Sequence, residues 1–208
     1  MDNKVVSIVT ATYNSGKYIE RCIASVQSQD YRFTQQIFID GGSIDKTVEF
    51  IESHMKNHDK CISEADEGIY DALNKGNALC DGDVIGILHS DDVFFDSTSI
   101  SKVMSMFTAD PEVQLVYGDL VHVDHTGKVS RYWRPGPFKR WKLFFGWMPP
   151  HPTVFIRRSC LERLGGYDKA YRISGDYDFI LKAFSSDLKS GYIPEIITKM
   201  TAGGASNG

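Results

Sequence analysis

The sequence predicts one α/β domain with a mostly parallel β-sheet, helices on both faces and a smaller antiparallel element late in the chain. Three observations lead to this prediction. Short apolar runs alternate with segments of helical periodicity in the first half. The run Val84–Leu88 is almost uninterrupted, as in a strand that helices cover on both faces. Residues 115–133 contain two strand-like runs around a turn, which indicates a hairpin.

The first half is expected to contain four strands with three helices between them. The strands are expected at residues 5–9, 36–39, 60–63 and 84–88. Apolar residues at helical spacing place the helices: Ile19, Cys22, Ile23 and Val26, then Val48, Ile51 and Met55, then Ile69, Leu73 and Gly76. Right-handed crossovers between successive strands would make all four strands parallel.

Polar residues follow each of these strands. They form clusters at residues 10–14, 40–43, 64–68 and 89–92. Ligands of parallel sheets bind beyond the carboxyl ends of the strands, where such clusters meet. We therefore expect one acidic, ligand-binding rim.

The second half is expected to contain shorter helices and strands, with some of the strands antiparallel. Its expected elements are a helix around Ile100–Phe107, the hairpin strands 115–123 and 129–133, an ordered loop at 135–150 with one short helix, a strand at 153–156, and helices at 159–164 and 176–184. No repeat or flexible linker interrupts the chain. Residues 1–208 are therefore expected to be one domain, with a first half up to about residue 110 and a second half from about 111.

Composition is that of a soluble globular protein, with 42% hydrophobic and 24% charged residues. No apolar run approaches the roughly 20 residues that span a bilayer. The N-terminal residues lead directly into the first strand, so we expect no secretory signal and a cytoplasmic location. The cysteines are far apart and are expected to be free thiols: Cys22, Cys61, Cys80 and Cys160.

Charge is distributed unevenly along the chain. Residues 1–124 hold 9 Lys and Arg against 21 Asp and Glu, whereas residues 125–161 hold 8 Lys and Arg, no acid and all three tryptophans. Such a segment could stack on sugars, bind a phosphorylated acceptor or lie on anionic lipid headgroups. It could equally be a folded loop with core aromatics and solvated charges. No nucleic-acid-binding motif accompanies it, so we expect no nucleic-acid partner.

The pair Asp91-Asp92 follows the apolar run 84–88 directly. Two adjacent carboxylates repel each other, and a divalent cation relieves that repulsion. Oxygen ligands favour Mg²⁺ or Mn²⁺, and Mg²⁺ is typically held by one or two carboxylates together with substrate phosphates. A solvated turn is the alternative for an isolated pair, but the neighbouring acidic clusters favour a cation site.

The segment Asp40–Thr47 contains two glycines that would let the backbone approach a ligand closely. Ser43, Asp45 and Thr47 suit the start of a helix. Asp40 is expected to have no capping role and to accept the N–H of a nucleobase instead. The chain has no P-loop and no GxGxxG motif, so we expect a bridging metal to neutralise the phosphates.

Five segments together resemble the family 2 glycosyltransferases. They are Val9–Asn14, Asp40–Thr47, Glu64–Gly76, Ser90-Asp91-Asp92 and Ser174–Phe179, in the order and rough spacing of that family. The likeness extends from Val5 to about Ser206. It implies a single GT-A-like domain with a Rossmann-like, mostly parallel sheet, a nucleotide-sugar-binding first half and an acceptor-binding second half.

The resemblance also implies roles for individual residues on the donor side. Ala11, Tyr13 and Asp40 would line the nucleoside pocket, with the Tyr13 ring beside the base. Asp66 and Asn74 lie in the matching donor segment. Asp91 would lie near the ribose, and Asp92 would coordinate a Mn²⁺ or Mg²⁺ ion that bridges the diphosphate.

On the acceptor side, Asp176 matches the acid that acts as general base in such enzymes, and Gly175 replaces the usual glutamate before it. Asp178 is an alternative base, but residues two apart in a helix do not share a face. His151, Arg157 and Trp147 are candidate acceptor-side residues, with a packed or solvated role as the alternative for His151 and Arg157.

The sequence thus predicts an inverting, metal-dependent glycosyltransferase of bacterial polysaccharide synthesis. A nucleotide-sugar donor, with a UDP-sugar favoured, would serve a saccharide or lipid-linked acceptor, with peripheral contact to an anionic membrane at its inner face. Two other classes are considered: a non-catalytic nucleotide-sugar-binding module, against which Asp176 argues, and a sugar-phosphate nucleotidyltransferase. The latter would need a Gly-rich basic loop after the first strand, where only Gly16 and Lys17 occur.

Overall fold

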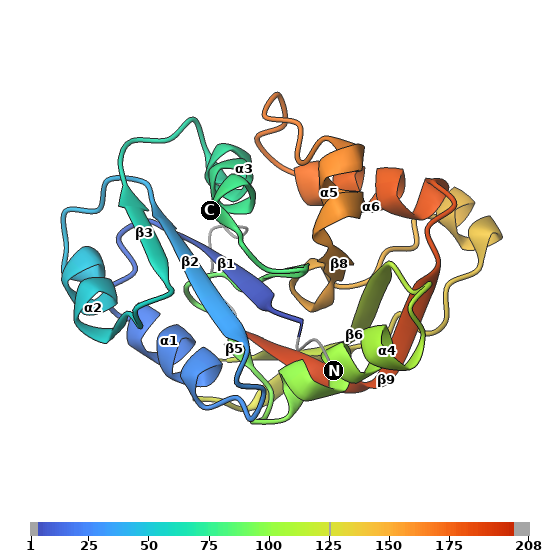
Figure 1. The fold of residues 1–208 in the computed structure, drawn as a ribbon, viewed down its shortest axis with the longest axis horizontal. Coiled ribbons are helices and arrows are strands. Elements are labelled where there is room, and N and C mark those ends of the chain that lie inside the picture. The colour runs from blue at the N-terminus through green and yellow to red at the C-terminus, as the bar shows by residue number, and fades with distance from the viewer. Residues whose placement is uncertain (1–3, 125, 202–208) are drawn as a thin grey trace.

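The computed structural model describes residues 4–124 and 126–201 of the chain. Within these residues the strands form one mixed sheet, with the order β3-β2-β1-β4-β8-β6-β9-β5 and with β7 paired to β6 (Figure 1). The strands are β1 (Val6–Thr12), β2 (Thr34–Asp40), β3 (Lys60–Ser63), β4 (Val84–Ile87), β5 (Val93–Phe94), β6 (Leu115–Val123), β7 (Val129–Trp133), β8 (Phe155–Arg157) and β9 (Ser190–Thr201).

Helices fill most of the connections between these strands. The α-helices are α1 (Ile19–Gln27), α2 (Thr47–His54), α3 (Ile69–Leu79), α4 (Ser99–Ala109), α5 (Arg158–Leu164) and α6 (Gly175–Ser185), and the 3₁₀ helices are η1 (Arg140–Phe145) and η2 (His151–Thr153). Each helix and strand expected from the sequence is present, with bounds that differ by a few residues. The expected strand at 153–156 begins two residues later, because Thr153 ends η2.

The first four strands run parallel, as predicted. β1 lies between β2 and β4, with Thr12 opposite Asp40 and Val9 opposite Ile87, and β3 flanks β2 with Ser63 opposite Asp40. Their carboxyl ends therefore lie at one edge of the sheet, which we call the carboxyl edge. The polar residues that follow these strands come together there.

The second half of the sheet is mixed. β8 runs antiparallel to both β4 and β6, so β6 runs in the direction of β4, and β7 forms the predicted hairpin with β6. β9 runs parallel to β6, and the short strand β5 pairs antiparallel with β9. The sequence analysis did not predict β9 or β5. Proline cannot donate to a strand ladder, and Pro194 lies where the β6–β9 register shifts, between Ile193 and Ile196.

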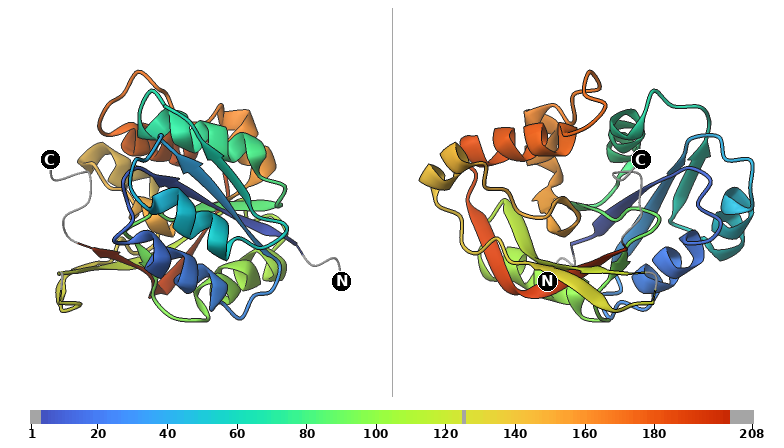
Figure 2. Two further views of the ribbon diagram at one scale, coloured as in Figure 1. Left: turned by 90° about the vertical axis from the view of Figure 1, so that its left-hand side faces the viewer. Right: turned by 180° about the vertical axis from the view of Figure 1, so that it is seen from behind.

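Helices cover both faces of the sheet, as predicted (Figures 1 and 2). α3, α5 and α6 pack on one face, where Leu73, Leu161 and Phe179 share a core with Val9 and Ile87. α1 and α4 pack on the other face against residues of opposite orientation on the same strands, such as Ile8 and Val84. Alternation along each strand thus serves two helix layers at once, which explains why no polar residue interrupts β4.

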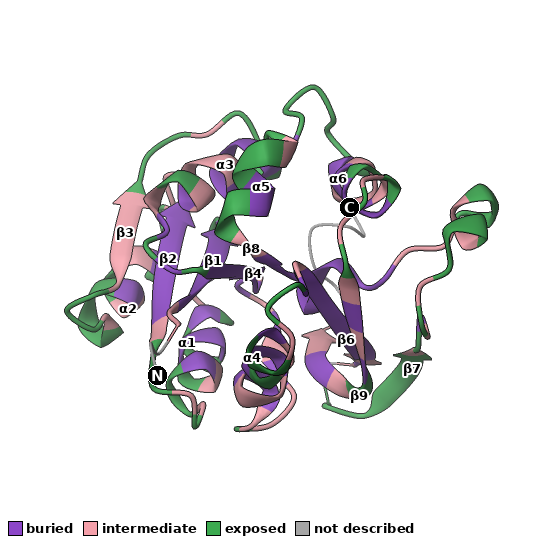
Figure 3. Ribbon diagram, turned by 45° about the vertical axis from the view of Figure 1, so that its right-hand side comes forward, coloured by how far each residue is buried: buried purple, intermediate pink, exposed green. Residues whose placement is uncertain are grey.

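The segment 129–147 lies at the periphery. β7 is mostly exposed (Figure 3), and η1 projects beyond α6 at the margin of the molecule (Figure 1, gold). All four cysteines are free, as predicted. None of the helices in the described part of the chain has the length and apolarity needed to cross a membrane.

Candidate active site

Hydrogen bonds join the turns at the carboxyl edge into one rim. After β1, Asn14 adopts a left-handed conformation with φ of 47°. Its side-chain oxygen accepts the N–H of Ile44 at 3.0 Å, and its own N–H reaches the Ser43 hydroxyl at 2.8 Å. The Ser15 hydroxyl contacts that of Ser90 at 2.8 Å. The loops after β1, β2 and β4 are therefore held together, as the sequence analysis expected for the rim.

Tyr13, Gly41 and Asp66 form one corner of this rim. The Tyr13 side chain is 63% exposed. A Cβ on Gly41 would lie 2.8 Å from Asp66 Oδ2 and 3.4 Å from the Tyr13 ring, so both side chains approach the Gly41 backbone. Asp66 Oδ1 accepts the N–H of Gly68 at 2.9 Å. An exposed ring and a carboxylate oxygen on a glycine turn form a surface suited to a planar, hydrogen-bonding ligand.

Asp40 has a capping role, so the opposite expectation is wrong. The side chain is fully buried. Its Oδ2 accepts the N–H groups of Gly42 and Ser43 at 3.1 and 2.8 Å and the Ser63 hydroxyl at 2.7 Å, and its Oδ1 accepts the Ser43 hydroxyl. The carboxylate therefore holds the turn between β2 and α2 in shape.

The acidic pair lies where β4 ends and has an asymmetric environment. Asp91 is half-buried, whereas Asp92 is fully buried. Burial, with a further contribution from Asp91, raises the pKa of Asp92 well above its ordinary value. Asp92 Oδ2 has no hydrogen-bond partner among the described residues. A buried acceptor of this kind suits a cation.

Sequence reasoning did not find that the end of β9 closes on this pair. The Thr201 hydroxyl donates to the Asp91 carbonyl at 2.9 Å, and its N–H lies 3.3 Å from Asp92 Oδ1. The sequence did not predict β9, because Pro194 interrupts its strand pattern. Thr201 is part of the rim only through this strand.

Asp176, His151 and His89 come together beside the acidic pair. Burial lowers the pKa of His89, and Asp91 and Asp176 act in the opposite direction, so both carboxylates lie near this ring. Burial lowers the pKa of His151 to about 4, with a further contribution from His89. The ring centroids of the two histidines lie 6.2 Å apart. The sequence analysis placed His89 in a polar cluster but gave it no role of its own. Its position directly after β4 could have indicated that it belongs to the site.

His151 is a packed histidine as well as a rim residue. It is 6% exposed, and its Nε2 lies 2.8 Å from the Tyr167 hydroxyl. Asp176 lies in the first turn of α6, where its Oδ1 accepts the Tyr70 hydroxyl at 3.4 Å. Asp178 instead lies 2.6 Å from Lys182 Nζ in an ion pair along the helix. Asp176 is thus the carboxylate of α6 next to the histidines.

Two expected ligand-binding residues, Asn74 and Arg157, have structural partners. Both polar atoms of the Asn74 amide bind the Tyr167 backbone, at 2.7 and 2.9 Å, which favours a structural role over donor contact. Arg157 lies opposite Val84, at the start of β4, and its guanidinium binds the carbonyls of Val113 and Pro111. Because β8 is antiparallel to β4, Arg157 lies away from the carboxyl edge, and its acceptor-side placement is wrong.

Trp147 anchors the loop 135–150. Its indole N–H donates to the Pro135 carbonyl at 2.8 Å, and its ring packs against Tyr117, Phe138 and Phe184. Within the loop 135–150, the exposed aromatic residues lie in η1: Trp141 at 57%, Phe144 at 88% and Phe145 at 81%. Trp147 is only partly buried, and its acceptor-side role stays a prediction.

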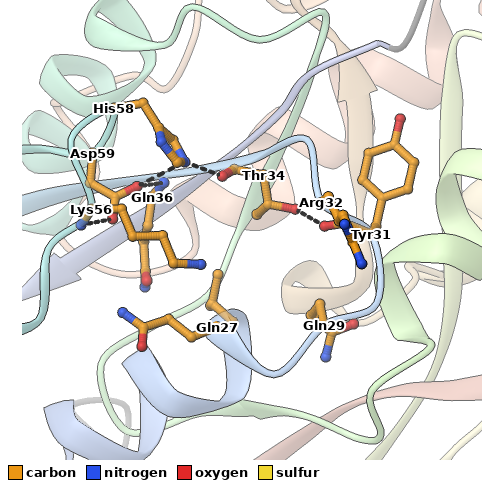
Figure 4. Close-up of a pocket in the computed structure, with 10 residues that line it drawn as sticks. Gln27, Gln29, Tyr31, Arg32, Thr34, Gln36, Lys56, His58 and Asp59 are labelled. Carbon is orange, nitrogen blue, oxygen red and sulfur yellow. Dashed lines mark hydrogen bonds and ion pairs between the residues drawn. The ribbon is translucent and has the colours of Figure 1, made fainter.

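A cavity of about 300 Å³ lies elsewhere in the molecule (Figure 4). Its lining comes from the end of α1, the start of β2 and the loop between α2 and β3, and includes Gln27, Tyr31, Arg32, Lys56 and His58. This is the amino end of the parallel strands. Ligands of such sheets bind at the other end, so we assign the site to the carboxyl edge.

The fold is that of an α/β protein whose candidate site lies at the carboxyl edge of parallel strands, beside the half-buried Asp91 and the buried Asp92. The chain belongs to glycosyl transferase family 2, whose profile matches residues 7–165. It is 32% identical over 180 residues to an uncharacterized glycosyltransferase of Mycobacterium tuberculosis, covering 86% of this chain and 68% of that protein. It is 27% identical over 206 residues to a PGL/p-HBAD biosynthesis glycosyltransferase of Mycobacterium bovis, covering 97% and 78%.

Solved structures share the fold. Staphylococcus aureus TarS 1–349 in complex with UDP-GlcNAc is similar with a TM-score of 0.75 at 16% identity, covering 95% of this chain and 58% of that one. The mannosyltransferase PcManGT from Pyrobaculum calidifontis, in complex with GDP-Man and Mn²⁺, is similar with a TM-score of 0.74 at 17% identity, covering 97% and 58%. The chain thus spans less than two thirds of these proteins. The predicted GT-A fold is confirmed.

Proposed function

We propose that the chain transfers a sugar, with inversion, from a nucleotide-diphosphate sugar to a hydroxyl of a saccharide or lipid-linked acceptor in cell-surface polysaccharide synthesis. One observation carries the proposal: the carboxylates of Asp91 and Asp176 both lie near the His89 ring, and Asp91 is the neighbour of Asp92, whose buried Oδ2 has no hydrogen-bond partner among the described residues. A cation-binding acid and a free carboxylate base are the two groups that such a transfer needs.

The proposed donor lies along the carboxyl edge. Tyr13 stacks on the base, Ala11 and Asp40 shape the pocket beneath it, and Asp66 Oδ2 accepts a base N–H. Asp91, half-buried and ahead of the buried Asp92, lies toward the ribose. A UDP-sugar remains the favoured donor, because a carboxylate acceptor suits the uracil N–H, and the likeness to a UDP-GlcNAc complex agrees with this choice. Guanine offers a similar N–H.

Asp92, with Asp91 beside it, would hold a Mn²⁺ or Mg²⁺ ion. The described residues contain no group of three His, Cys, Asp or Glu side chains that could hold a metal by themselves. One or two carboxylates completed by substrate phosphates are nevertheless the usual ligand set of Mg²⁺, and the unpartnered Asp92 oxygen fits that set. When bound, the ion would stabilise negative charge on the departing diphosphate as a Lewis acid.

Asp176 is the proposed general base, in preference to Asp178. It accepts the proton of the acceptor hydroxyl while that oxygen forms a bond to the anomeric carbon, and the bond from that carbon to the diphosphate breaks on the opposite face. Asp178 is engaged by Lys182. His151, which is buried, and His89, which is half-buried, lie beside Asp176, exclude water and border the acceptor.

A thermal-shift panel of UDP-, GDP- and dTDP-sugars with and without Mn²⁺ tests the donor proposal. A ligand that binds only the folded protein raises its melting temperature by mass action. We expect one nucleotide-sugar family to stabilise the protein in a Mn²⁺-dependent way and Asp92→Ala to abolish this effect. No shift with any donor, or an undiminished shift in Asp92→Ala, would contradict the proposal.

The alternative classes make different predictions in the same assays. A non-catalytic binding module would bind the donor but would have no activity that depends on Asp176. A sugar-phosphate nucleotidyltransferase would use a nucleoside triphosphate and would need cations near the first loop. There the Gly16 N–H already donates to Asp45 at 3.0 Å. The acidic rim favours the glycosyltransferase.

We further propose a cytoplasmic protein that contacts an anionic membrane peripherally through η1. Trp141, Phe144 and Phe145 are exposed beside Lys139, Arg140 and Lys142, and residues 125–161 contain no acid. Exposed aromatics among cations suit a bilayer interface.

Wild type should float with anionic liposomes, and Arg140→Glu with Lys142→Glu should lose this binding. Absence of flotation in wild type, or its persistence in the charge-reversed variant, would refute membrane contact.

A further inference from the structure

The loop 165–174, which leads into α6, is bound along one side of α3, although about 100 residues separate the two segments. Asn74 of α3 clamps the Tyr167 backbone with two hydrogen bonds. Lys169 Nζ lies 2.7 Å from Glu67 and 3.1 Å from Asp71, just before and within the first turn of α3. The donor-side helix thus carries the loop that positions the proposed base.

Tyr70 makes the last of these contacts, at Asp176 itself. The Tyr70 side chain is buried, and its hydroxyl accepts the Gly175 N–H at 2.8 Å and donates to Asp176 Oδ1 at 3.4 Å. Its ring stacks on Tyr167 at 5.9 Å. One hydroxyl therefore fixes both the first backbone amide of α6 and the carboxylate that follows it.

The sequence around α6 is adapted to this contact. A Cβ on Gly175 would lie 2.7 Å from the Tyr70 ring, so the ring occupies the space of any larger residue. Ser174 adopts a left-handed conformation with φ of 68°, which costs a non-glycine residue energy that its surroundings must offset. The close approach of Tyr70 thus explains why glycine stands where glutamate is common in the family.

We infer that Tyr70 is a positioning residue, which holds the Asp176 carboxylate toward the acceptor from the donor-binding helix α3. The inference rests on the proposed function, in which Asp176 is the base. A misplacement of about 1 Å in a reacting group can lower a rate about 100-fold. The Tyr70 hydroxyl forms hydrogen bonds with Gly175 and Asp176, neither of which is a proposed donor-binding residue.

Hydrolysis of the donor that gives the largest thermal shift supplies an assay that needs no known acceptor. Water attacks the anomeric carbon, its proton passes to Asp176, and the bond to the diphosphate breaks to release the nucleoside diphosphate. We expect Tyr70→Phe to lower kcat about 10-fold or more while the donor KM changes less than twofold. Lys169→Ala, at a partly exposed position, should lower kcat less, because it loosens the same loop.

Tyr31→Phe is the matched control. It removes a tyrosine hydroxyl that donates to the Lys4 carbonyl at 2.6 Å, far from the carboxyl edge, and should leave kcat unchanged. Asp176→Asn separates the two claims. If Asp176→Asn is inactive and Tyr70→Phe keeps the wild-type kcat, or changes only KM, the positioning role is overturned and the base remains. If Asp176→Asn keeps full activity, the base assignment fails and the inference falls with it.

Discussion

At the scale of single residues, Asp92 is the clearest case of a side chain whose position lowers the stability of the folded protein. A buried carboxylate without a complete set of hydrogen bonds is unfavourable in its charged form. Asp92 is fully buried, and one of its oxygens has no partner in the described part of the chain. Residues of this kind are kept where a ligand completes their environment.

Asp92→Asn should therefore stabilise the protein in the absence of divalent cations, because the amide carries no charge to bury. A gain of about 1 kcal/mol would raise the melting temperature by about 2–4 °C in a chain of this size. The variant should also lose stabilisation by Mn²⁺ with a nucleotide-sugar. As a control, Asp59→Asn should lower stability, since Asp59 accepts the N–H groups of Gln36 and Lys56. A melting temperature below that of wild type in metal-free Asp92→Asn would contradict this account.

His151 makes stability depend on pH. Its pKa in the folded protein is about 4, mainly through burial, against an ordinary value of 6.5. As pH falls below about 6.5 the unfolded chain takes up the proton while the folded protein resists it, so stability should fall between about pH 6.5 and 4 and then level off. The nearby His89 is shifted in the same direction.

Chemical denaturation of wild type and His151→Gln at pH 7 and pH 5 measures this effect. We expect wild type to lose on the order of 1–3 kcal/mol more than the variant, at about 1.4 kcal/mol per unit of pKa shift. The exposed His54 provides the control, since His54→Gln should keep the wild-type slope. Equal slopes in wild type and His151→Gln would show that His151 is not the responsible group.

At the scale of elements, the parallel strands could be predicted because burial of apolar residues dominates their sequences. Val84–Ile87 is buried on both faces, and no polar residue interrupts it. β9 could not be predicted, because Pro194 disrupts its pattern and its partner β6 lies about 75 residues earlier. Its pairing depends on tertiary contacts that a local pattern does not carry.

The contact between α3 and the sheet gives a prediction at this scale. Gly76 of α3 lies so close to β1 that a Cβ would be 2.3 Å from Val9 Cγ1 and 3.3 Å from Ile39 Cγ1. In an open helix, Gly→Ala stabilises by about 1 kcal/mol. Here overpacking should reverse the sign, so Gly76→Ala should destabilise the protein by about 1–3 kcal/mol in urea denaturation. A more stable Gly76→Ala would mean that α3 packs less closely than described.

At the scale of the whole molecule, sequence reasoning located the rim but not its internal contacts. The polar ends of β1, β2 and β4 do meet, because parallel strands share one edge. The structural roles of Asp40 and Asn74 could not be predicted. The sequence does not distinguish a side chain that binds the protein backbone from one that faces a ligand. Arg157 was misplaced because the direction of β8 was unknown. Tyr70 could have been found only through its contact with Gly175, 105 residues away.

Amide hydrogen exchange with and without a UDP-sugar and Mn²⁺ tests most directly whether the donor binds at the carboxyl edge. Protection reports where a ligand stabilises the backbone. The account predicts new protection in residues 11–16, 40–45, 64–70 and 89–94, and unchanged exchange in residues 27–36 and 55–59 around the polar cavity of Figure 4. Protection confined to the cavity segments, with an unaltered carboxyl edge, would contradict it.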